Sequence, residues 1–506
     1  MRFVQLFFLF AFFFITNSLF AQRIVYSKPS SDDNKRMSFE IIGKVSGNFL
    51  VYKQVKNTSY ISVYNNEMEE TAKIEQDYIN DNRLLNIDFF PYSDFTYAIY
   101  QYQKKSIVYC DVVKIDGDGN KVGEVRNLDT THLSFSGNNH VYTSISSENK
   151  ENIMVFKVNS KNRTKYIITT LLFNKELDLQ KRSRFLVNME EHRDRLDEFN
   201  IDNDGDLIFS RYFRNSNETI NKTELVFKPA LSDSLLFINV PHENILLDKP
   251  LVKVDNYNKR YFLTSFYYEK KRGNIEGFYF YAWDKNTGQP SLQNAMVLSE
   301  KLREEARGDA SVKSAFNDYF VRNIIIKKDG GFLINSEAFY TTSRFNNWNR
   351  WNYLYGMPMN SYDYYYSSPV YNNWRWRQNR FGNGQQVRSH AENITIFSFD
   401  ASGNLEWNNV IRKEQFDDES DDKISYLMAN TGNQIHYLFN LDQRRALLLH
   451  DFALSPGGEI SQNPMLKNLD RGFEFLPKYG KQVSANQLIV PCYNRNYLCF
   501  AKIEFN

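Results

Sequence analysis

The chain has 506 residues, of which 42% are hydrophobic and 24% charged, and this composition excludes disorder, collagen and coiled coil as global descriptions. Its 62 Lys and Arg against 60 Asp and Glu give a net charge of +2, which also excludes a protein that binds polyanions over its whole surface. Aromatic residues make up 16% of the chain, beside only 12 Pro and 22 Gly, and this favours strands over helices.

The first 21 residues have the pattern of a secretory signal peptide. Arg2 precedes an apolar run over 3–15, and Ala21 stands before Gln22. This run is shorter than the ~20 apolar residues of a membrane-spanning helix, and it ends in a cleavage-like site. We therefore expect cleavage after Ala21, export to the periplasm or extracellular space, and no transmembrane segment in the mature chain.

Tight-turn signals recur along the mature chain, each followed by an alternating apolar stretch. Gly47, Gly205 and Gly432 lie in such turns, and a second class of turn, with Gly119 and Gly403, lies between them. Tight hairpins need residues that tolerate positive φ, which Gly and Asn do. Each unit therefore predicts a four-stranded antiparallel meander of the kind that forms a propeller blade.

Seven complete units are predicted, over residues 39–78, 86–128, 132–189, 197–240, 251–298, 320–414 and 425–466. The stretch 475–506 supplies three more strands, and 23–27 supplies one orphan strand. We expect residues 24–26 to pair beside 498–505, because this completes an eighth blade and removes exposed sheet edges. The prediction is one all-β domain over 22–506, an eight-bladed β-propeller closed by its N-terminal strand, with seven blades as the alternative.

Two segments have the form of the turn between the outer strands of a blade: FDASGNLEW at 399–407 and YAWDKNTGQP at 281–290. On these segments and the repeated units, the chain resembles bacterial secreted β-propeller repeat proteins with PQQ-like or WD40-like blades. The resemblance covers nearly all of the mature chain as architecture. It transfers no cofactor-binding residue, so no cofactor is expected from it.

Propeller geometry places the two tight turns of a blade on one face, and its middle loop and the connection to the next blade on the other. All the long segments fall in the second positions. They include short helices predicted at 188–199 and 299–316, the latter with Ser299 as N-cap, and the largest insertion, 341–390. Because the long segments all lie on one face, we expect that face to be the binding surface.

The insertion 341–390 is rich in aromatic and arginine side chains, with six Arg against one Asp. Such residues are enriched at binding hot spots, and flat rings also stack on sugars. The predicted binding residues are Trp348, Trp351, Tyr353, Tyr355, Tyr364, Tyr365, Tyr366, Trp374, Arg375, Trp376 and Arg377. The alternatives are disorder, or a loop folded over its own propeller with Arg375 and Arg377 paired to the acidic run 417–422.

The chain lacks the motifs HExxH, GxSxG and a Walker-type glycine loop, and its seven His are scattered. The leading hypothesis is therefore a non-enzymatic binding or scaffold module for an envelope protein or a glycan, with no nucleic-acid partner. The alternative is a carbohydrate-active enzyme with acidic residues at the channel mouth. The oligomeric state is left open.

Two acidic segments are candidates for a calcium ion. The first consists of Asp417, Asp418, Asp421 and Asp422, and a solvated charge run is its ordinary explanation. The second, 200–206, begins like a calcium loop but has Arg211 where a bidentate Glu is required, so we expect a hairpin turn with solvated carboxylates.

Cys492 and Cys499 flank a predicted hairpin and could face each other across two strands. The sequence is compatible with a disulfide between them and with two packed reduced thiols.

Overall fold

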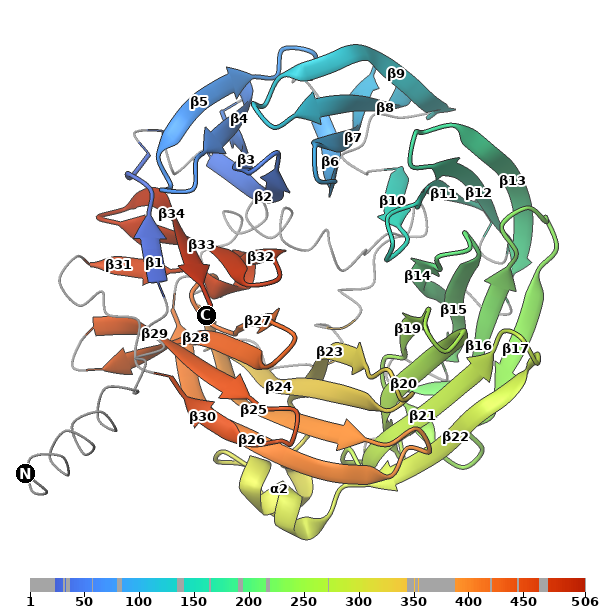
Figure 1. Ribbon diagram of the computed structural model, residues 1–506. Coiled ribbons are helices and arrows are strands. Elements are labelled where there is room, and N and C mark those ends of the chain that lie inside the picture. Colours follow the sequence, from blue (N-terminus) through green and yellow to red (C-terminus); the bar gives the residue numbers. More distant parts are fainter. Residues whose placement is uncertain are drawn as a thin grey trace, which may run out of the picture.

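The computed structural model describes residues 23–30, 32, 37–56, 58–79, 84–133, 141–162, 165–189, 194–214, 219–271, 273–343, 350, 354, 387–418, 421–443, 446–463 and 472–505. The fold is all-β, and antiparallel sheets follow one another in chain order around a ring (Figure 1). Repeated four-stranded sheets in such a ring are consistent with a β-propeller.

The first three meanders lie over residues 37–188, each with its first strand nearest the axis of the ring (Figure 1). Their strands are β2 (Met37–Val45), β3 (Asn48–Val55), β4 (Thr58–Tyr64) and β5 (Glu70–Glu75); β6 (Leu84–Pro91), β7 (Phe95–Lys104), β8 (Ile107–Asp116) and β9 (Lys121–His132); and β10 (Tyr142–Ser146), β11 (Asn152–Asn162), β12 (Lys165–Asn174) and β13 (Leu179–Asn188).

The next two meanders belong to one nine-stranded sheet, in which the two-residue strand β18 (Leu246–Leu247) joins β16 (Ile220–Lys228) to β20 (Arg260–Tyr268). Their strands are β14 (Arg195–Ile201), β15 (Leu207–Arg214), β16 (Ile220–Lys228) and β17 (Leu236–Val240); and β19 (Leu251–Asp255), β20 (Arg260–Tyr268), β21 (Gly277–Asp284) and β22 (Gln289–Val297).

Two helical turns precede the sixth meander: the helix α2 (Glu300–Ala306) and the 3-10 helix η3 (Val312–Ser314). The sixth and seventh meanders consist of β23 (Tyr319–Ile326), β24 (Phe332–Ser343), β25 (Val387–Phe399) and β26 (Leu405–Asp417); and β27 (Leu427–Asn430), β28 (Ile435–Gln443), β29 (Ala446–Leu454) and β30 (Ile460–Gln462).

The last sheet combines the two ends of the described chain. Its strands are β31 (Phe473–Phe475), β32 (Lys481–Ser484), β33 (Gln487–Asn494), β34 (Tyr497–Glu504) and β1 (Arg23–Tyr26), with the 3-10 helix η4 (Pro477–Tyr479) between β31 and β32. Ile24 is registered with Ile503 and Tyr26 with Ala501, so the predicted pairing of the N-terminal strand with the last strand is confirmed.

Hydrophobic cores lie between neighbouring meanders rather than in one central mass. Phe280 of β21, for example, stacks edge-on against Phe399 of β25, with ring centroids 4.7 Å apart. The interface between the last sheet and the first contains Ile489 and Phe500 on one side and Phe49 on the other. Packing therefore continues across the point where the chain closes on itself, and it uses many of the aromatic residues that make the composition unusual.

The tight turns at Gly47, Gly119, Gly205, Gly403 and Gly432 form as their sequences predict, each with its glycine at positive φ. Gly458, in the β29–β30 turn, has φ of +88°, and a Cβ atom there would lie 2.7 Å from the indole of Trp407 in the neighbouring meander. Only glycine combines this backbone conformation with so close an approach of the next sheet.

One of the two predicted connecting helices is present. The Ser299 side chain accepts a hydrogen bond from Leu302 N and caps α2, as predicted. The helix predicted over 188–199 is wrong, because residues from Arg195 on form the extended strand β14, paired with β15. Of the described residues in this segment, Asp197 and Glu198 form ion pairs and Arg195 lines the cavity described below. Sheet pairing therefore takes precedence over local helix propensity here.

Candidate functional site

A cavity of about 450 Å³ lies at the axis of the ring. Its lining comes from the first strands of the first four meanders, from Phe156 of β11 in the third of them and from β32 of the last sheet, so five parts of the ring converge on it. The lining also includes Tyr92 and Lys150, which belong to tight turns. The cavity therefore extends toward the face opposite the one that we expect to carry the insertion 341–390. Its size is within the ~300–1,000 Å³ of ordinary ligand pockets.

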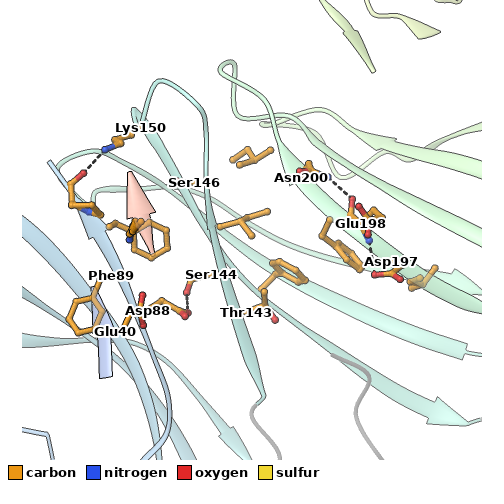
Figure 2. A pocket seen from close by; sticks show the side chains of 18 of the residues that line it. Glu40, Asp88, Phe89, Thr143, Ser144, Ser146, Lys150, Asp197, Glu198 and Asn200 are labelled. Atoms are coloured by element: carbon orange, nitrogen blue, oxygen red, sulfur yellow. Dashed lines mark hydrogen bonds between the residues drawn. The ribbon is translucent and has the colours of Figure 1, made fainter. Parts of the chain in front are cut away.

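Two carboxyl groups lie side by side in this cavity, Glu40 from β2 and Asp88 from β6 (Figure 2). Asp88 accepts hydrogen bonds at both oxygens, from Asn86 Nδ2 to Oδ1 at 3.0 Å and from the Ser144 hydroxyl to Oδ2. These donors stabilise a carboxylate. Burial raises the pKa of Glu40 to about 7; Lys481 opposes this shift and the charge of Asp88 adds to it.

A second acidic pair, Asp197 and Glu198 of β14, lies on the other side of the view in Figure 2. Lys249 Nζ is 3.3 Å from Asp197 Oδ2 and 3.3 Å from Glu198 Oε1, so one ammonium group forms ion pairs with both carboxyl groups. Burial raises the pKa of Glu198, which Lys249 counteracts.

The backbone of Glu198 is unusual. Its φ is +56°, and the pairing of β14 with β15 shifts between Asp197 and Asn200, so Glu198 lies in a β-bulge. A non-glycine residue in this region costs about 1–3 kcal/mol and is found where the surroundings require it. Bulges next to sites redirect side chains, and this one lies on the cavity wall.

Three cationic side chains also line the cavity: Lys150, Arg195 and Lys481. Lys481 Nζ donates to the carbonyl oxygens of Ile41 at 3.1 Å and Ile42 at 3.0 Å, which places its charge next to Glu40. Burial lowers the pKa of Lys481, and the Glu40 carboxyl opposes that shift.

Aromatic side chains complete the wall. Phe89, Phe90 and Tyr92 follow Asp88 directly along β6 and its turn. Phe199 of β14 stacks on Phe156 of β11 with ring centroids 4.8 Å apart. Rings beside carboxyl, hydroxyl and ammonium groups can bind a polyhydroxyl ligand through its faces and its hydroxyls.

The predicted binding residues of the insertion, from Trp348 to Arg377, lie outside the described residues. The insertion does join β24 to β25, as the middle loop of the sixth meander. Arg350, within it, is described: its guanidinium is buried, bonds Asp248 and lies 3.9 Å from the ring centre of Phe320. One arginine of the insertion is therefore packed against the body of the protein.

The acidic run 417–422 is engaged by neighbouring side chains. Asp418 pairs with Arg388 at 2.5 Å and Asp421 with Lys478 at 2.5 Å. The Tyr479 hydroxyl donates to Asp422 Oδ1 at 2.5 Å. Within the described part of the chain, no group of three His, Cys, Asp or Glu side chains is arranged to hold a metal ion.

The hairpin 200–206 gathers its carboxylates around a lysine. Lys285 Nζ lies 2.6 Å from Asp202 Oδ2, 2.7 Å from Asp204 Oδ2 and 2.6 Å from Asp206 Oδ2. Burial alone lowers the pKa of Lys285, but the three carboxylates reverse this and raise it. The turn is present as expected. Asp202 and Asp206 are mostly buried against an ammonium from the next meander, whereas Asp204 is paired with the same ammonium and remains 49% exposed.

Cys492 and Cys499 are registered partners across β33 and β34, with Sγ atoms 2.8 Å apart, and both are free thiols in the structure. Both side chains are fully buried.

The cavity residues were not singled out from the sequence. Their signal is an acidic residue inside a predicted apolar first strand, as Glu40 is in FEIIGKV and Asp88 in NIDFF. Because a helix was wrongly predicted over 188–199, Asp197 and Glu198 were not expected in a first strand. The sequence alone does not show that these strands surround one axis, since this follows from the closure of the ring.

None of the helices in the part of the chain that the structure covers is long and apolar enough to cross a membrane. Comparison of the sequence with known protein families and with curated proteins found no match.

Solved structures with a similar arrangement share little sequence with this chain. An uncharacterized protein of Listeria monocytogenes is 9% identical with a TM-score of 0.39, covering 82% of this chain and 95% of its own. A polysaccharide lyase, an ulvan lyase, is 11% identical with a TM-score of 0.36, covering 81% and 90%. Prolyl oligopeptidase B of Galerina marginata is 8% identical with a TM-score of 0.41, covering 91% and 56%. At these values the likenesses carry no argument about function.

Proposed function

We propose that this chain is an exported, eight-bladed β-propeller that binds a carbohydrate in the cavity at its axis. The count of eight takes the nine-stranded sheet as two blades and the last sheet as one blade closed by β1. Seven stretches of core between consecutive meanders and an eighth between the last sheet and the first support it. Export rests on the leader pattern of residues 1–21.

The observation that carries the binding proposal is the composition of the cavity wall. Carboxyl and hydroxyl groups such as Asp88 and Ser144 alternate there with the rings of Phe89, Phe90 and Phe199. Sugars offer hydroxyls at their edges and apolar C–H faces, so a wall with both kinds of group matches them.

The experiment is titration calorimetry with a panel of neutral oligosaccharides (cello-, xylo-, malto- and chito-oligomers) and acidic ones (oligogalacturonate and oligoalginate). Ser146→Trp fills the cavity from β10 and is expected to abolish the binding seen with the unaltered protein. Ser291→Trp, on the exposed outer strand β22, is its matched control and is expected to bind normally. Absence of binding throughout the panel, or binding that survives Ser146→Trp, would contradict the proposal.

We propose the insertion 341–390 as a second binding site, for a protein or glycan partner, on the face of the ring opposite the one toward which the cavity extends. Its Trp, Tyr and Arg content supports this. Deletion of 355–386 leaves the anchored residue Arg350 in place and is expected to abolish capture of a partner from an envelope extract, with cavity binding unchanged. Equal capture by the deleted protein would contradict this contact.

A carbohydrate-active enzyme is the second candidate. The specific observation in its favour is that four carboxyl groups line the cavity, namely Glu40, Asp88, Asp197 and Glu198.

A further inference from the structure

The two neighbouring carboxyl groups of the cavity have unlike surroundings. Both oxygens of Asp88 accept hydrogen bonds, from Asn86 and Ser144. Within the described residues no hydrogen-bond donor reaches the Glu40 carboxyl group, and the side chain is partly buried in the cavity wall. Neighbouring carboxyl groups whose environments favour opposite protonation states are suited to separate acid and base roles.

We propose that Glu40 and Asp88 hydrolyse a glycosidic bond of the carbohydrate bound in the cavity, Glu40 as proton donor and Asp88 as proton acceptor. This inference rests on the proposed carbohydrate binding. Glu40 transfers its proton to the glycosidic oxygen as the bond from that oxygen to the anomeric carbon breaks. A water molecule adds to the anomeric carbon and gives its proton to Asp88, so the products are two sugars with free hydroxyls.

The charged groups that face Glu40 fit this role. Lys481 and Asp88 are the nearest, with opposite effects on its charge, and Tyr52 packs behind it in β3. Burial outweighs both charges and raises the pKa of Glu40 to about 7, so the donor keeps its proton up to neutral pH.

The other acidic pair is less suited to proton transfer. Lys249 bridges Asp197 and Glu198, and Glu198 Oε2 lies 3.4 Å from the backbone N–H of Val252. One shared ammonium engages both carboxyl groups of this pair, so we place neither of them in the proton-transfer steps. We infer that this pair, together with Lys249, holds the wall of the cavity in position.

The charge of the lining indicates an uncharged substrate. Four carboxyl groups and the cationic side chains Lys150, Arg195 and Lys481 line the cavity, and Lys249 adds a cation beside Asp197 and Glu198. A lining that carries both signs of charge gives a uronic acid no advantage over a neutral sugar. The neutral oligosaccharides of the panel are therefore the expected substrates.

The test uses the oligosaccharide that binds in the calorimetric experiment, with release of reducing ends as the readout. Glu40→Gln and Asp88→Asn are expected to retain binding within about threefold and to lose at least about a hundredfold in turnover, as removal of a general acid or base does. Glu75→Gln, on the exposed outer strand β5, is the matched control and is expected to keep full turnover. Turnover by the unaltered protein is expected to fall as pH rises through about 7.

Ser144→Ala tests the positioning of Asp88. Since the hydroxyl donates to Asp88 Oδ2, its loss is expected to lower turnover and to shift the acidic limb of the pH profile upward, because the carboxylate loses a stabilising donor. Binding should not change.

The outcomes separate the two proposals. A protein that binds a neutral oligosaccharide without cleaving it overturns the acid–base assignment and leaves carbohydrate binding intact. Turnover that survives both Glu40→Gln and Asp88→Asn also overturns the assignment. A protein that binds no member of the panel overturns carbohydrate binding itself, and the inference with it.

Discussion

The Arg350 guanidinium donates two hydrogen bonds to the Asp248 carboxylate, Nε to Oδ1 at 3.1 Å and Nη2 to Oδ2 at 2.6 Å, and both side chains are buried. Removal of one partner from a buried pair leaves the other charge uncompensated. We expect Arg350→Ala to lower the free energy of unfolding by about 3–5 kcal/mol, measured by urea denaturation. Arg388→Ala breaks the exposed pair with Asp418 and should leave the free energy of unfolding nearly unchanged. Equal losses in the two variants would contradict the anchoring role of Arg350.

Glu40 makes stability depend on pH. Its pKa is raised from 4.5 to about 7 in the folded protein, so the stability that its protonated form contributes is complete below pH 4.5 and is lost as pH rises toward 7. We expect Glu40→Gln to match the unaltered protein at pH 4 and to be more stable at pH 8 by about 1–2 kcal/mol, less than a shift of this size implies because the side chain is only half-buried. Thermal unfolding at the two pH values measures this; an equal difference at both would show that Glu40 does not titrate in this range.

Lys285 neutralises three carboxylates of the neighbouring hairpin. We expect Lys285→Ala to destabilise the protein by about 2–4 kcal/mol, since Asp202, Asp204 and Asp206 then repel one another. Thermal unfolding measures this loss. Lys259→Ala, which removes an exposed partner of Asp204 alone, is the control and should have little effect. Equal losses in the two variants would contradict the role of Lys285.

Tyr26 fastens the N-terminal strand to the last sheet by stacking on Phe473, with ring centroids 4.3 Å apart. We expect Tyr26→Ala to cost about 2–4 kcal/mol, in line with other truncations of packed aromatic side chains. Tyr497→Ala, in the same sheet but 51% exposed, should cost less than about 1 kcal/mol. A small effect of Tyr26→Ala on the chemical denaturation midpoint would mean that β1 contributes little to closure of the ring.

The three cysteines are buried, and burial raises the pKa of Cys110 and Cys492. Since the thiolate is the reactive form, none should react with a thiol reagent in the folded protein. Three thiols should react after denaturation without reductant. Reaction of a single thiol would show that Cys492 and Cys499 are joined as a disulfide.

Much of the fold could be predicted from the sequence because its turns are local. The Asp204–Gly205 turn and the Ser299 cap are specified by neighbouring residues, and both formed as expected. The helix predicted over 188–199 failed because its charges, viewed alone, fit a solvated helix. The pairing of β14 with β15 competes with a helix over the same residues, and the ion pairs of Asp197 and Glu198 involve Lys249, about 50 positions further along the chain.

The candidate site was the least predictable part. Glu40 and Asp88 are 48 positions apart in the chain, and no local pattern indicates that their strands face one axis. Lys481 joins them from the far end of the chain. A site assembled from five parts of a ring has no contiguous sequence motif. The only sequence feature that indicates it is the presence of charged residues inside apolar first strands.

The pairing of Ile24 with Ile503 has a kinetic consequence. This contact joins residues separated by almost the entire polypeptide, so the loop it closes is nearly as long as the chain, and contacts of such high order form late. The early meanders can collapse as soon as they emerge, but the ring cannot be sealed before the final strand has been made. Until then its first strand has no partner, and its edge is open to other chains.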